Sequence, residues 1–243
     1  MSVQRLDPVS DAAEVRDATA ALFEAASALA PDAVTGPSLL PGWTRGHVMT
    51  HLARNSDALV NLLTWARTGE ERAMYVSEEA RNKDIEDGAS RPLPEQLADL
   101  RRGADALAEA MDAMPPQAWA AQVRTRHGGV RPAAQIPMMR LRELHLHLVD
   151  LDVGRTCADL PAGFVARDLA ALADGLSGRE GIPAVRLRCT DSGETWNIGN
   201  ADEPELTVSG PAGALLAWVT GRSRGEDLTA DPQAPLPVLP PLG

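Results

Sequence analysis

Residues 138–152 hold the side chains whose types and spacing could bind a metal, in the run Met-Met-Arg-Leu-Arg-Glu-Leu-His-Leu-His-Leu-Val-Asp-Leu-Asp. On a helix, Glu143 and His147 are four residues apart and point the same way, one turn from each other. On a strand, Glu143, His145 and His147 would share one face. The composition favours the helix, because Val149 is the only β-branched residue and Leu, Met, Arg and Glu dominate.

A Glu-x3-His pair on one helical face is half of a metal site and needs a third ligand from elsewhere in the chain. His47 and His51 have the same four-residue spacing and lie in another predicted helix. One of them, with Glu143 and His147, gives two imidazoles and one carboxylate and leaves a fourth position open, as catalytic zinc requires. The alternative is that these residues are surface or core-edge groups, because structural ion pairs use the same spacing.

The composition limits the classes of protein and of partner. A chain of 243 residues, 44% hydrophobic and only 3% aromatic, can bury a core of Ala, Leu and Val in one or two domains. A formal charge of −11 argues against nucleic acid and anionic membranes as partners. Cys157 and Cys189 form no disulfide framework or zinc-knuckle spacing, and no signal peptide or membrane-length apolar run is present. We therefore expect a cytoplasmic protein, and its oligomeric state stays open, a monomer included.

Residues 1–155 are predicted to form a four-helix unit that positions the candidate ligands. Asp7 or Ser10 is expected to cap the first of these helices, Thr44 the second, and Ser77 a short extra helix that carries Arg81. The second helix is expected to have an apolar stripe of Val48, Leu52, Leu59 and Leu62. Ser77 lies in a long connection, residues 69–91, and connections of this length in a compact bundle more often have a function than not. The stretch 117–136 reads as irregular. The expected helices are 7–30, 45–68, 93–114 and 138–152.

Residues 156–243 are predicted to form a small α+β domain without catalytic-looking residues. They contain no Gly-rich phosphate loop and no Gly-x-Ser-x-Gly elbow. The proline-rich tail from Asp227 is expected to wrap a surface. The expected helices are 162–176 and 211–221, and the expected strands are 185–190, 195–198 and 205–208.

Three segments, residues 40–51, 74–82 and 139–151, resemble the mycothiol-dependent maleylpyruvate isomerases, a family of DinB-like metal-binding proteins. The first and third are shared by many mycothiol-dependent relatives, and residues 74–82 are the narrower match. The resemblance covers essentially the whole chain. It implies a two-domain α+β fold: a DinB-like four-helix bundle, then a small α+β domain similar to sterol carriers.

Carried over position by position, the resemblance implies that His51, Glu143 and His147 bind zinc and that Arg81 is catalytic. It does not make His47 a ligand, so we interpret that residue as supporting a ligand or packing.

The other notable side chains receive no catalytic role from the resemblance. His145 points about 200° away from the Glu143–His147 face of a helix, so it is expected to be packed or solvent-facing. His127 stays unassigned in its turn. Trp43 and Tyr75 are either packing residues or substrate contacts.

The resemblance implies mycothiol and a small-molecule substrate as partners, and a cis–trans isomerisation of maleylpyruvate to fumarylpyruvate. Zinc would keep the mycothiol sulfur deprotonated or polarise the substrate carbonyl. The thiolate would add to the double bond, allow rotation and leave, while Arg81 pairs with a carboxylate or the developing enolate oxygen. Two alternatives remain: a mycothiol S-transferase acting on another electrophile, and a non-enzymatic protein whose C-terminal domain holds an apolar ligand.

Overall fold

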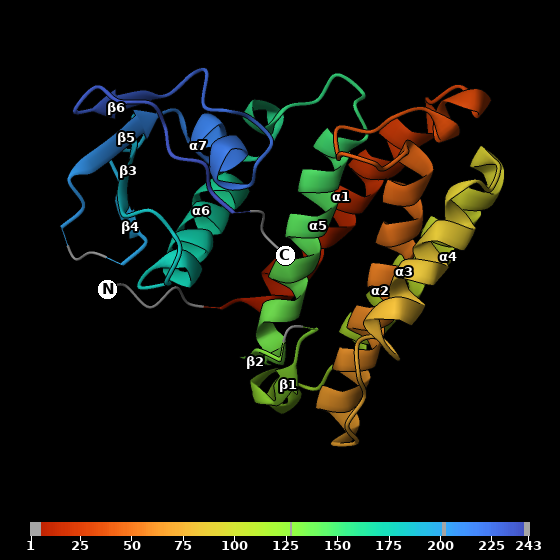
Figure 1. Cartoon of the computed structure of the whole chain (residues 1–243). Helices are drawn as coiled ribbons and strands as arrows, with labels where there is room; N and C mark the ends of the chain where they lie inside the picture. The colour runs from red at the N-terminus through yellow and green to blue at the C-terminus, as the bar shows by residue number, and fades with distance from the viewer. Residues whose placement is uncertain (1–5, 127, 201–202, 241–243) are drawn as a thin grey trace. The chain divides into compact units, whose positions relative to one another are not determined.

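The structure is a computed structural model, and it describes residues 6–126, 128–200 and 203–240 (Figure 1). The chain divides into two compact units, Met1–Gly154 and Arg155–Gly243. The boundary expected from the sequence lies one residue further along the chain. Within the described ranges, no helix has both the length and the hydropathy needed to cross a membrane.

The first unit is a helical bundle in which α1 packs against α5, and α2 packs against both α4 and the shorter α3. Figure 1 shows the α1–α5 pair in red and green, and α2 in orange beside the yellow helices. These helices are α1 (Pro8–Ser27), α2 (Arg45–Thr68), α3 (Glu78–Ala89), α4 (Leu93–Asp112) and α5 (Ile136–Asp150).

Side-chain caps fix where three of these helices begin. The Asp7 carboxylate accepts a hydrogen bond from the Ser10 amide at the start of α1. The Thr44 hydroxyl caps α2, and the Ser77 hydroxyl accepts from the Ala80 amide to start α3. Each cap satisfies a backbone donor that has no partner within the helix. The Thr44 and Ser77 caps are those predicted from the sequence, and Asp7 is one of the two residues proposed to cap α1.

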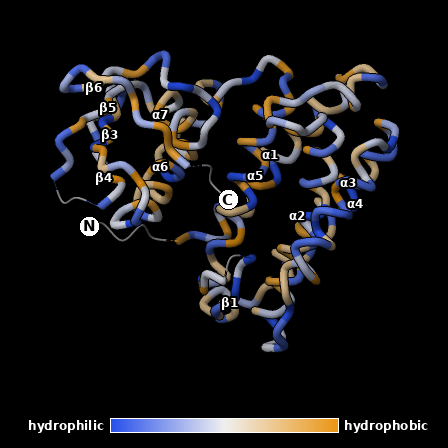
Figure 2. Tube along the Cα trace, viewed as in Figure 1, coloured by the Kyte–Doolittle hydropathy of each residue, from blue (hydrophilic) through white to orange (hydrophobic). Residues whose placement is uncertain are grey.

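The first unit buries one face of each of its long helices. The predicted apolar stripe of α2, which is Val48, Leu52, Leu59 and Leu62, is 0% exposed. Mixed hydrophilic and hydrophobic positions run along α2 and α4 in Figure 2, as expected for helices with one face in a core. Gly46 lets α3 approach α2 closely, because a Cβ there would lie 1.9 Å from the carbonyl oxygen of Ala89. That contact holds the helix that carries Arg81 against α2.

The prediction that residues 117–136 are irregular is wrong. They contain a 3-10 turn, Pro116–Ala120, and a short antiparallel hairpin of β1 (Gln122–Arg124) and β2 (Val130–Pro132). Strands of three residues are too short for an alternating pattern to stand out. The α5 helix also begins at Ile136, two residues before the predicted start. His127 lies outside the described residues.

The second unit is a small α+β domain, as the sequence predicts. Its sheet has the strand order β4-β3-β5-β6, in which β3 and β5 are parallel and the other neighbours antiparallel. The helices α6 and α7 pack against each other and against sheet strands. The elements are α6 (Ala162–Leu176), β3 (Val185–Cys189), β4 (Thr195–Ile198), β5 (Leu206–Gly210), α7 (Ala212–Val219) and β6 (Thr229–Asp231). The β6 strand was missed, because the prolines around it led us to interpret the tail as a surface wrap.

Candidate metal centre

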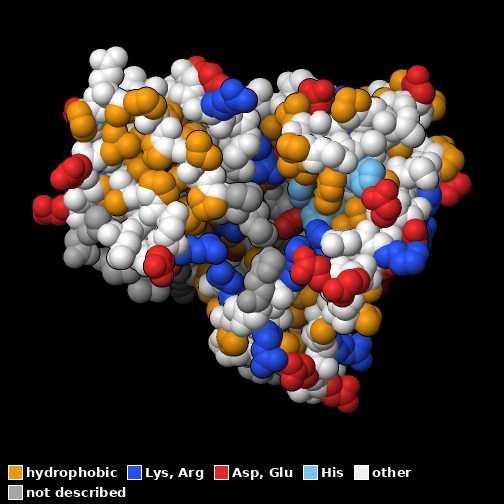
Figure 3. Space-filling model, viewed as in Figure 1, with side chains coloured by type: hydrophobic (Ala, Val, Ile, Leu, Met, Phe, Trp, Pro, Cys, Tyr) orange, Lys and Arg blue, Asp and Glu red, His pale blue; other side chains and the backbone are white. Residues whose placement is uncertain are grey.

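Side chains of α2 and α5 form a compact group of metal-binding types. His51 of α2 and Glu143 and His147 of α5 each offer a ligand atom, and these atoms all lie within 4.8 Å of one another. The Nε2 atom of His51 is 2.8 Å from Oε2 of Glu143, and Nε2 of His147 is 3.4 Å from the same oxygen. Histidine side chains, in pale blue, are visible on the first unit in Figure 3, with acidic and basic groups beside them. The structure thus brings together the residues that the resemblance implied.

A buried arginine holds the two contributing helices in register. Arg140 lies one turn before Glu143 on α5 and is 2% exposed. Its Nη1 atom donates to the carbonyl oxygen of Leu52 at 2.9 Å and to Oδ1 of Asn55 at 2.8 Å, both on α2. Burial lowers the pKa of Arg140 to about 10, so the side chain stays charged at neutral pH. Arg140 therefore fixes the position of Glu143 along the axis of α5 relative to His51 on α2.

The Glu143 carboxylate is ionised in this environment. Burial raises its pKa, but hydrogen bonds from His147 and His51 outweigh burial and hold the pKa well below its usual range. Burial lowers the pKa of His51 to about 4, so its imidazole is neutral. The centre therefore offers a carboxylate and a neutral imidazole at neutral pH, the forms that bind metal ions.

Asp150 orients the second imidazole. It is 0% exposed, and its Oδ2 atom lies 2.8 Å from Nδ1 of His147. Burial lowers the pKa of His147, but the hydrogen bonds to Asp150 and Glu143 outweigh it and leave the pKa raised. A carboxylate behind one ring nitrogen fixes the tautomer that presents the other nitrogen to a metal. Sequence reasoning missed Asp150, although its position three residues after His147 on the same helix could have indicated it.

Arg81 of α3 lies beside this group. Its Nη2 atom is 3.1 Å from Nδ1 of His51, and its Nη1 donates to Oδ1 of Asn82 at 3.0 Å. The Arg81 guanidinium also lies over the ring of Tyr75, with its central carbon 5.6 Å from the ring centroid. Burial raises the pKa of the Tyr75 hydroxyl, so the phenol is neutral at physiological pH. The structure thus brings the predicted catalytic arginine to the candidate ligands.

His47 has a structural role at the start of α2. Its Nδ1 atom accepts from the backbone amide of Thr44 at 3.1 Å, while its own amide donates to the Thr44 hydroxyl, which completes a capping box. Its Nε2 atom is 3.1 Å from Glu86 of α3. Both ring nitrogens are therefore engaged away from the three-residue group. The sequence left open support of a ligand or packing for His47, and the capping role was not among these expectations.

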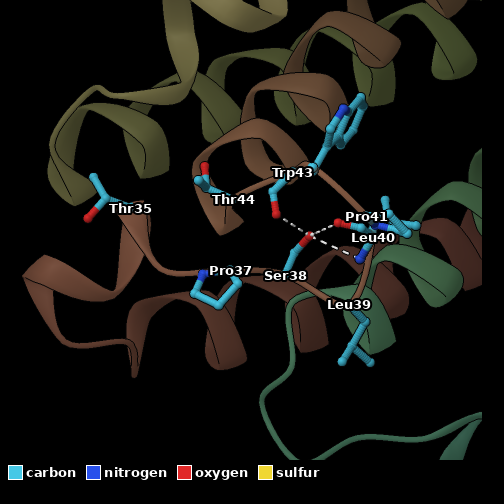
Figure 4. Close-up of a pocket in the computed structure, with 9 residues that line it drawn as sticks. Thr35, Pro37, Ser38, Leu39, Leu40, Pro41, Trp43 and Thr44 are labelled. Atoms are coloured by element: carbon cyan, nitrogen blue, oxygen red, sulfur yellow. Dashed lines mark hydrogen bonds between the residues drawn. The ribbon is translucent and has the colours of Figure 1, made fainter.

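The loop before α2 places Trp43 over two histidines. The Trp43 ring is stacked on His47, with centroids 6.0 Å apart, and meets His51 edge-on at 5.6 Å. Ser38 holds this loop by donating to the carbonyl oxygen of Trp43 at 2.9 Å (Figure 4). The amide of Leu39 donates to the Asp150 carbonyl oxygen at 2.9 Å, which ties the loop to the end of α5. A hollow of about 490 Å³ is lined by Thr35 and residues 37–44, which include this loop.

Two other groups that the sequence singled out lie outside the three-residue group. His145 is 7% exposed, and burial lowers its pKa to about 4. Of the two expectations for His145, the packed one is observed. Cys157 and Cys189 are both buried in the second unit.

The three side chains fit a catalytic metal ion. Two imidazole nitrogens and one carboxylate oxygen match the ligand set of zinc sites that keep an open position. The Nε2 atoms of His51 and His147 both lie close to Oε2 of Glu143. The contact with Asp150 holds the His147 ring in this orientation. Fold and site together define a two-domain α+β protein with a candidate two-histidine, one-glutamate metal centre in its helical unit.

Comparison with known families agrees with this class. The family described as "Mycothiol maleylpyruvate isomerase N-terminal domain" matches residues 15–152, and the family described as "MDMPI C-terminal domain" matches residues 159–241. The chain belongs to the mycothiol maleylpyruvate isomerase family. No curated protein sequence matches it.

Two solved structures have the same fold. One is a mycothiol-dependent maleylpyruvate isomerase, 29% identical, with a TM-score of 0.89. The other is a histidine-to-alanine mutant under the same name, 28% identical, with a TM-score of 0.90. Each match covers 98% of this chain and 98% of the solved one. The likeness therefore extends over both units.

Proposed function

We propose that this chain is a mycothiol-dependent maleylpyruvate isomerase, which converts maleylpyruvate to fumarylpyruvate. The observation that carries the proposal is the group of His51, Glu143 and His147 with Arg81 in contact with it. The family match over both units supports the same activity.

In this proposal His51, Glu143 and His147 hold a zinc ion. When bound, the zinc would keep the mycothiol sulfur deprotonated, which would supply a thiolate able to add to the substrate double bond, permit rotation and leave. Glu143 and the two imidazoles fix the position of the ion, and Asp150 keeps the His147 ring in the ligating orientation.

Arg81 is proposed to bind the anionic substrate. Its Nε atom is buried and has no hydrogen-bond partner among the described residues, so one donor of the guanidinium is left for a ligand. Maleylpyruvate is a diacid, and a planar guanidinium can hold a carboxylate or an enolate oxygen with two parallel hydrogen bonds. The Arg81 guanidinium lies over the Tyr75 ring, a cation–π contact that helps to hold it in place.

The nucleophilic sulfur is proposed to come from mycothiol. Cys157 and Cys189 are buried, and buried structural cysteines are inert as nucleophiles.

The two units are proposed to resemble different known domains. The first unit is proposed to resemble the DinB-like bundles. The second unit is proposed to resemble sterol-carrier domains, and its four-stranded sheet with α6 and α7 supports that likeness.

The test is an assay of maleylpyruvate conversion by the zinc-loaded protein, with and without mycothiol. We expect conversion only with mycothiol, and we expect it to persist in a Cys157→Ser/Cys189→Ser double variant. Conversion without any added thiol, abolished in the double variant, would instead show catalysis by a cysteine of the protein. Consumption of mycothiol with formation of a stable thioether would identify an S-transferase.

A further inference from the structure

A second hollow lies on the first unit between the segment before α3 and the β1–β2 hairpin. It has a volume of about 270 Å³, and Tyr75, Glu78 and Arg126 are among the side chains around it. We call it the Tyr75 pocket. Neither the metal ligands nor Arg81 line it.

The Tyr75 pocket is connected to the candidate metal centre through side-chain contacts. Tyr75 forms part of its lining, and the Tyr75 ring lies 5.6 Å from the guanidinium carbon of Arg81. Arg81 in turn reaches His51 at 3.1 Å. A ligand in the pocket is therefore two side chains away from the group that would hold the metal.

The charges of the pocket are balanced, which decides between two kinds of ligand. Arg126 pairs with Glu78 at 2.9 Å, and Arg124 pairs with Glu71 at 3.0 Å, and all four residues line the pocket. A dianionic substrate gains nothing from a lining whose two cations face two carboxylates. A neutral polyhydroxylated molecule does gain, because its hydroxyls both donate to carboxylates and accept from guanidinia.

The aromatic residues of the pocket agree with the same ligand class. Trp65 and Tyr75 both line it and are half-buried, so each presents part of its ring surface. Ligand sites typically combine such aromatic surface with a few polar groups that fix orientation. Thr125, also in the lining, adds a hydroxyl. The combination suits the carbon–hydrogen faces and hydroxyl edges of a sugar.

We propose that the Tyr75 pocket binds the glucosaminyl-inositol part of mycothiol and so directs its cysteinyl sulfur toward the metal centre. This inference rests on the proposed function. The cysteinyl arm is one residue long, about 3.5 Å when extended, plus its own side chain. With the sugar in the pocket, we expect the sulfur to lie on the Arg81 side of Tyr75.

Two variants test the pocket in the zinc-loaded full chain. Ala73→Trp fills the hollow from an exposed position in its lining, and Arg126→Ala removes a charged donor. Losing a hydrogen bond to a charged group raises a dissociation constant about 10- to 100-fold. We expect Arg126→Ala to raise KM for mycothiol by about that factor. Ala73→Trp should also raise it, because the added ring occupies the hollow, while KM for maleylpyruvate stays at the wild-type value in both variants.

Matched controls change the same chemistry outside the pocket. Val76→Trp adds the same ring at a position 97% exposed, and Arg72→Ala removes an exposed arginine. Neither residue lines the pocket, so both controls should keep the wild-type KM for mycothiol.

A calorimetric titration with N-acetylglucosaminyl inositol, which is neutral and has no sulfur, measures the pocket without any turnover. Binding to the wild type that is lost in Ala73→Trp and Arg126→Ala supports the pocket, even if maleylpyruvate is not converted and the proposed function fails. An unchanged KM for mycothiol in both variants, or no binding of the sugar to the wild type, overturns the inference. If Ala73→Trp does not fold, Arg126→Ala alone gives the same decision.

Discussion

The Arg81 guanidinium lies 3.1 Å from Nδ1 of His51 and can only donate to it. Nδ1 therefore holds the lone pair, and the proton of the neutral ring is on Nε2. That Nε2–H group points at the Glu143 carboxylate, 2.8 Å away. A metal bound at Nε2 needs the lone pair at Nε2, which moves the ring proton to Nδ1. Arg81 then loses its acceptor, so metal binding and the Arg81–His51 hydrogen bond exclude each other.

We expect His51 to change tautomer when zinc binds. Nitrogen-15 spectra of the imidazoles should show the Nε2–H form in chelator-treated protein and the Nδ1–H form after zinc is added. Arg81, released from His51, then has one more N–H donor for the substrate. An Nδ1–H tautomer already present before zinc addition would contradict this arrangement.

Arg81→Lys should keep zinc and lose most turnover. The charge remains, but the planar fork that holds an oxyanion with two hydrogen bonds is lost. Removing one such donor typically lowers kcat by about 10²–10³. Steady-state kinetics with a zinc determination on the same sample measures both quantities. The control is Arg102→Lys, at an exposed ion pair of α4, which should leave kcat unchanged. Near wild-type turnover in Arg81→Lys would show that Arg81 is not a catalytic residue.

Glu143→Ala and His147→Ala should each abolish zinc binding, because two protein ligands remain. The helices should persist, since the bundle has its own buried stripes. Metal analysis and circular dichroism of the purified variants separate the two effects. The control is His47→Asn, which keeps a residue able to accept a hydrogen bond at the start of α2. Full zinc occupancy in either ligand variant would show that the metal binds elsewhere.

Asp150→Asn tests the support of His147. Loss of the carboxylate behind a ligating histidine typically lowers metal affinity about 10- to 100-fold. Competition with a chromophoric chelator measures the change, and the fold should be kept because the Asp150 backbone contact to Leu39 is unaffected. Asp152→Asn is the matched control, since Asp152 pairs with Arg45 at the surface. Equal affinities for the two variants would mean that Asp150 does not orient the ligand.

The parts of the fold that follow from local chemistry could be predicted. The Thr44 and Ser77 caps and the apolar stripe of α2 are local patterns, and each was found where the sequence placed it. The pair of Glu143 and His147 follows from spacing on one helix. The choice between His47 and His51 as the third ligand did not follow from the sequence pattern, because the two are four residues apart on one helix and both are histidines. Only the family resemblance favoured His51.

What the sequence could not show depends on contacts between distant segments. The reach of Arg140 to Asn55 and the hydrogen bond of Arg81 to His51 each join residues on different helices. The capping role of His47 is local, but it was missed because a capping box usually has Glu or Gln at that position. The short strands of the hairpin were missed for another reason, which also applies to β6 beside the effect of its flanking prolines. Three residues are too few to show an alternating pattern.

Protonation of His145 should make the metal-free protein less stable in acid. Burial lowers the pKa of His145 from 6.5 to about 4, so the folded state keeps the ring neutral where the unfolded chain would protonate it. The unfolded state then binds more protons, and stability is lost as the pH falls from 6.5 toward 4. A shift of this size amounts to about 3 kcal/mol at the acid end. His51 acts in the same direction, and the raised pKa of His147 acts against it.

His145→Gln isolates this contribution, because His51 and His147 are present in both proteins. Urea unfolding of chelator-treated protein gives the free energy of unfolding at each pH. Between about pH 7 and pH 5, the wild type should lose more stability than the variant, with a difference approaching about 1.4 kcal/mol per pH unit. The variant should also be less stable at neutral pH, since a buried ring is replaced by a smaller amide. Parallel pH profiles for the two proteins would show that His145 has an ordinary pKa in the folded state.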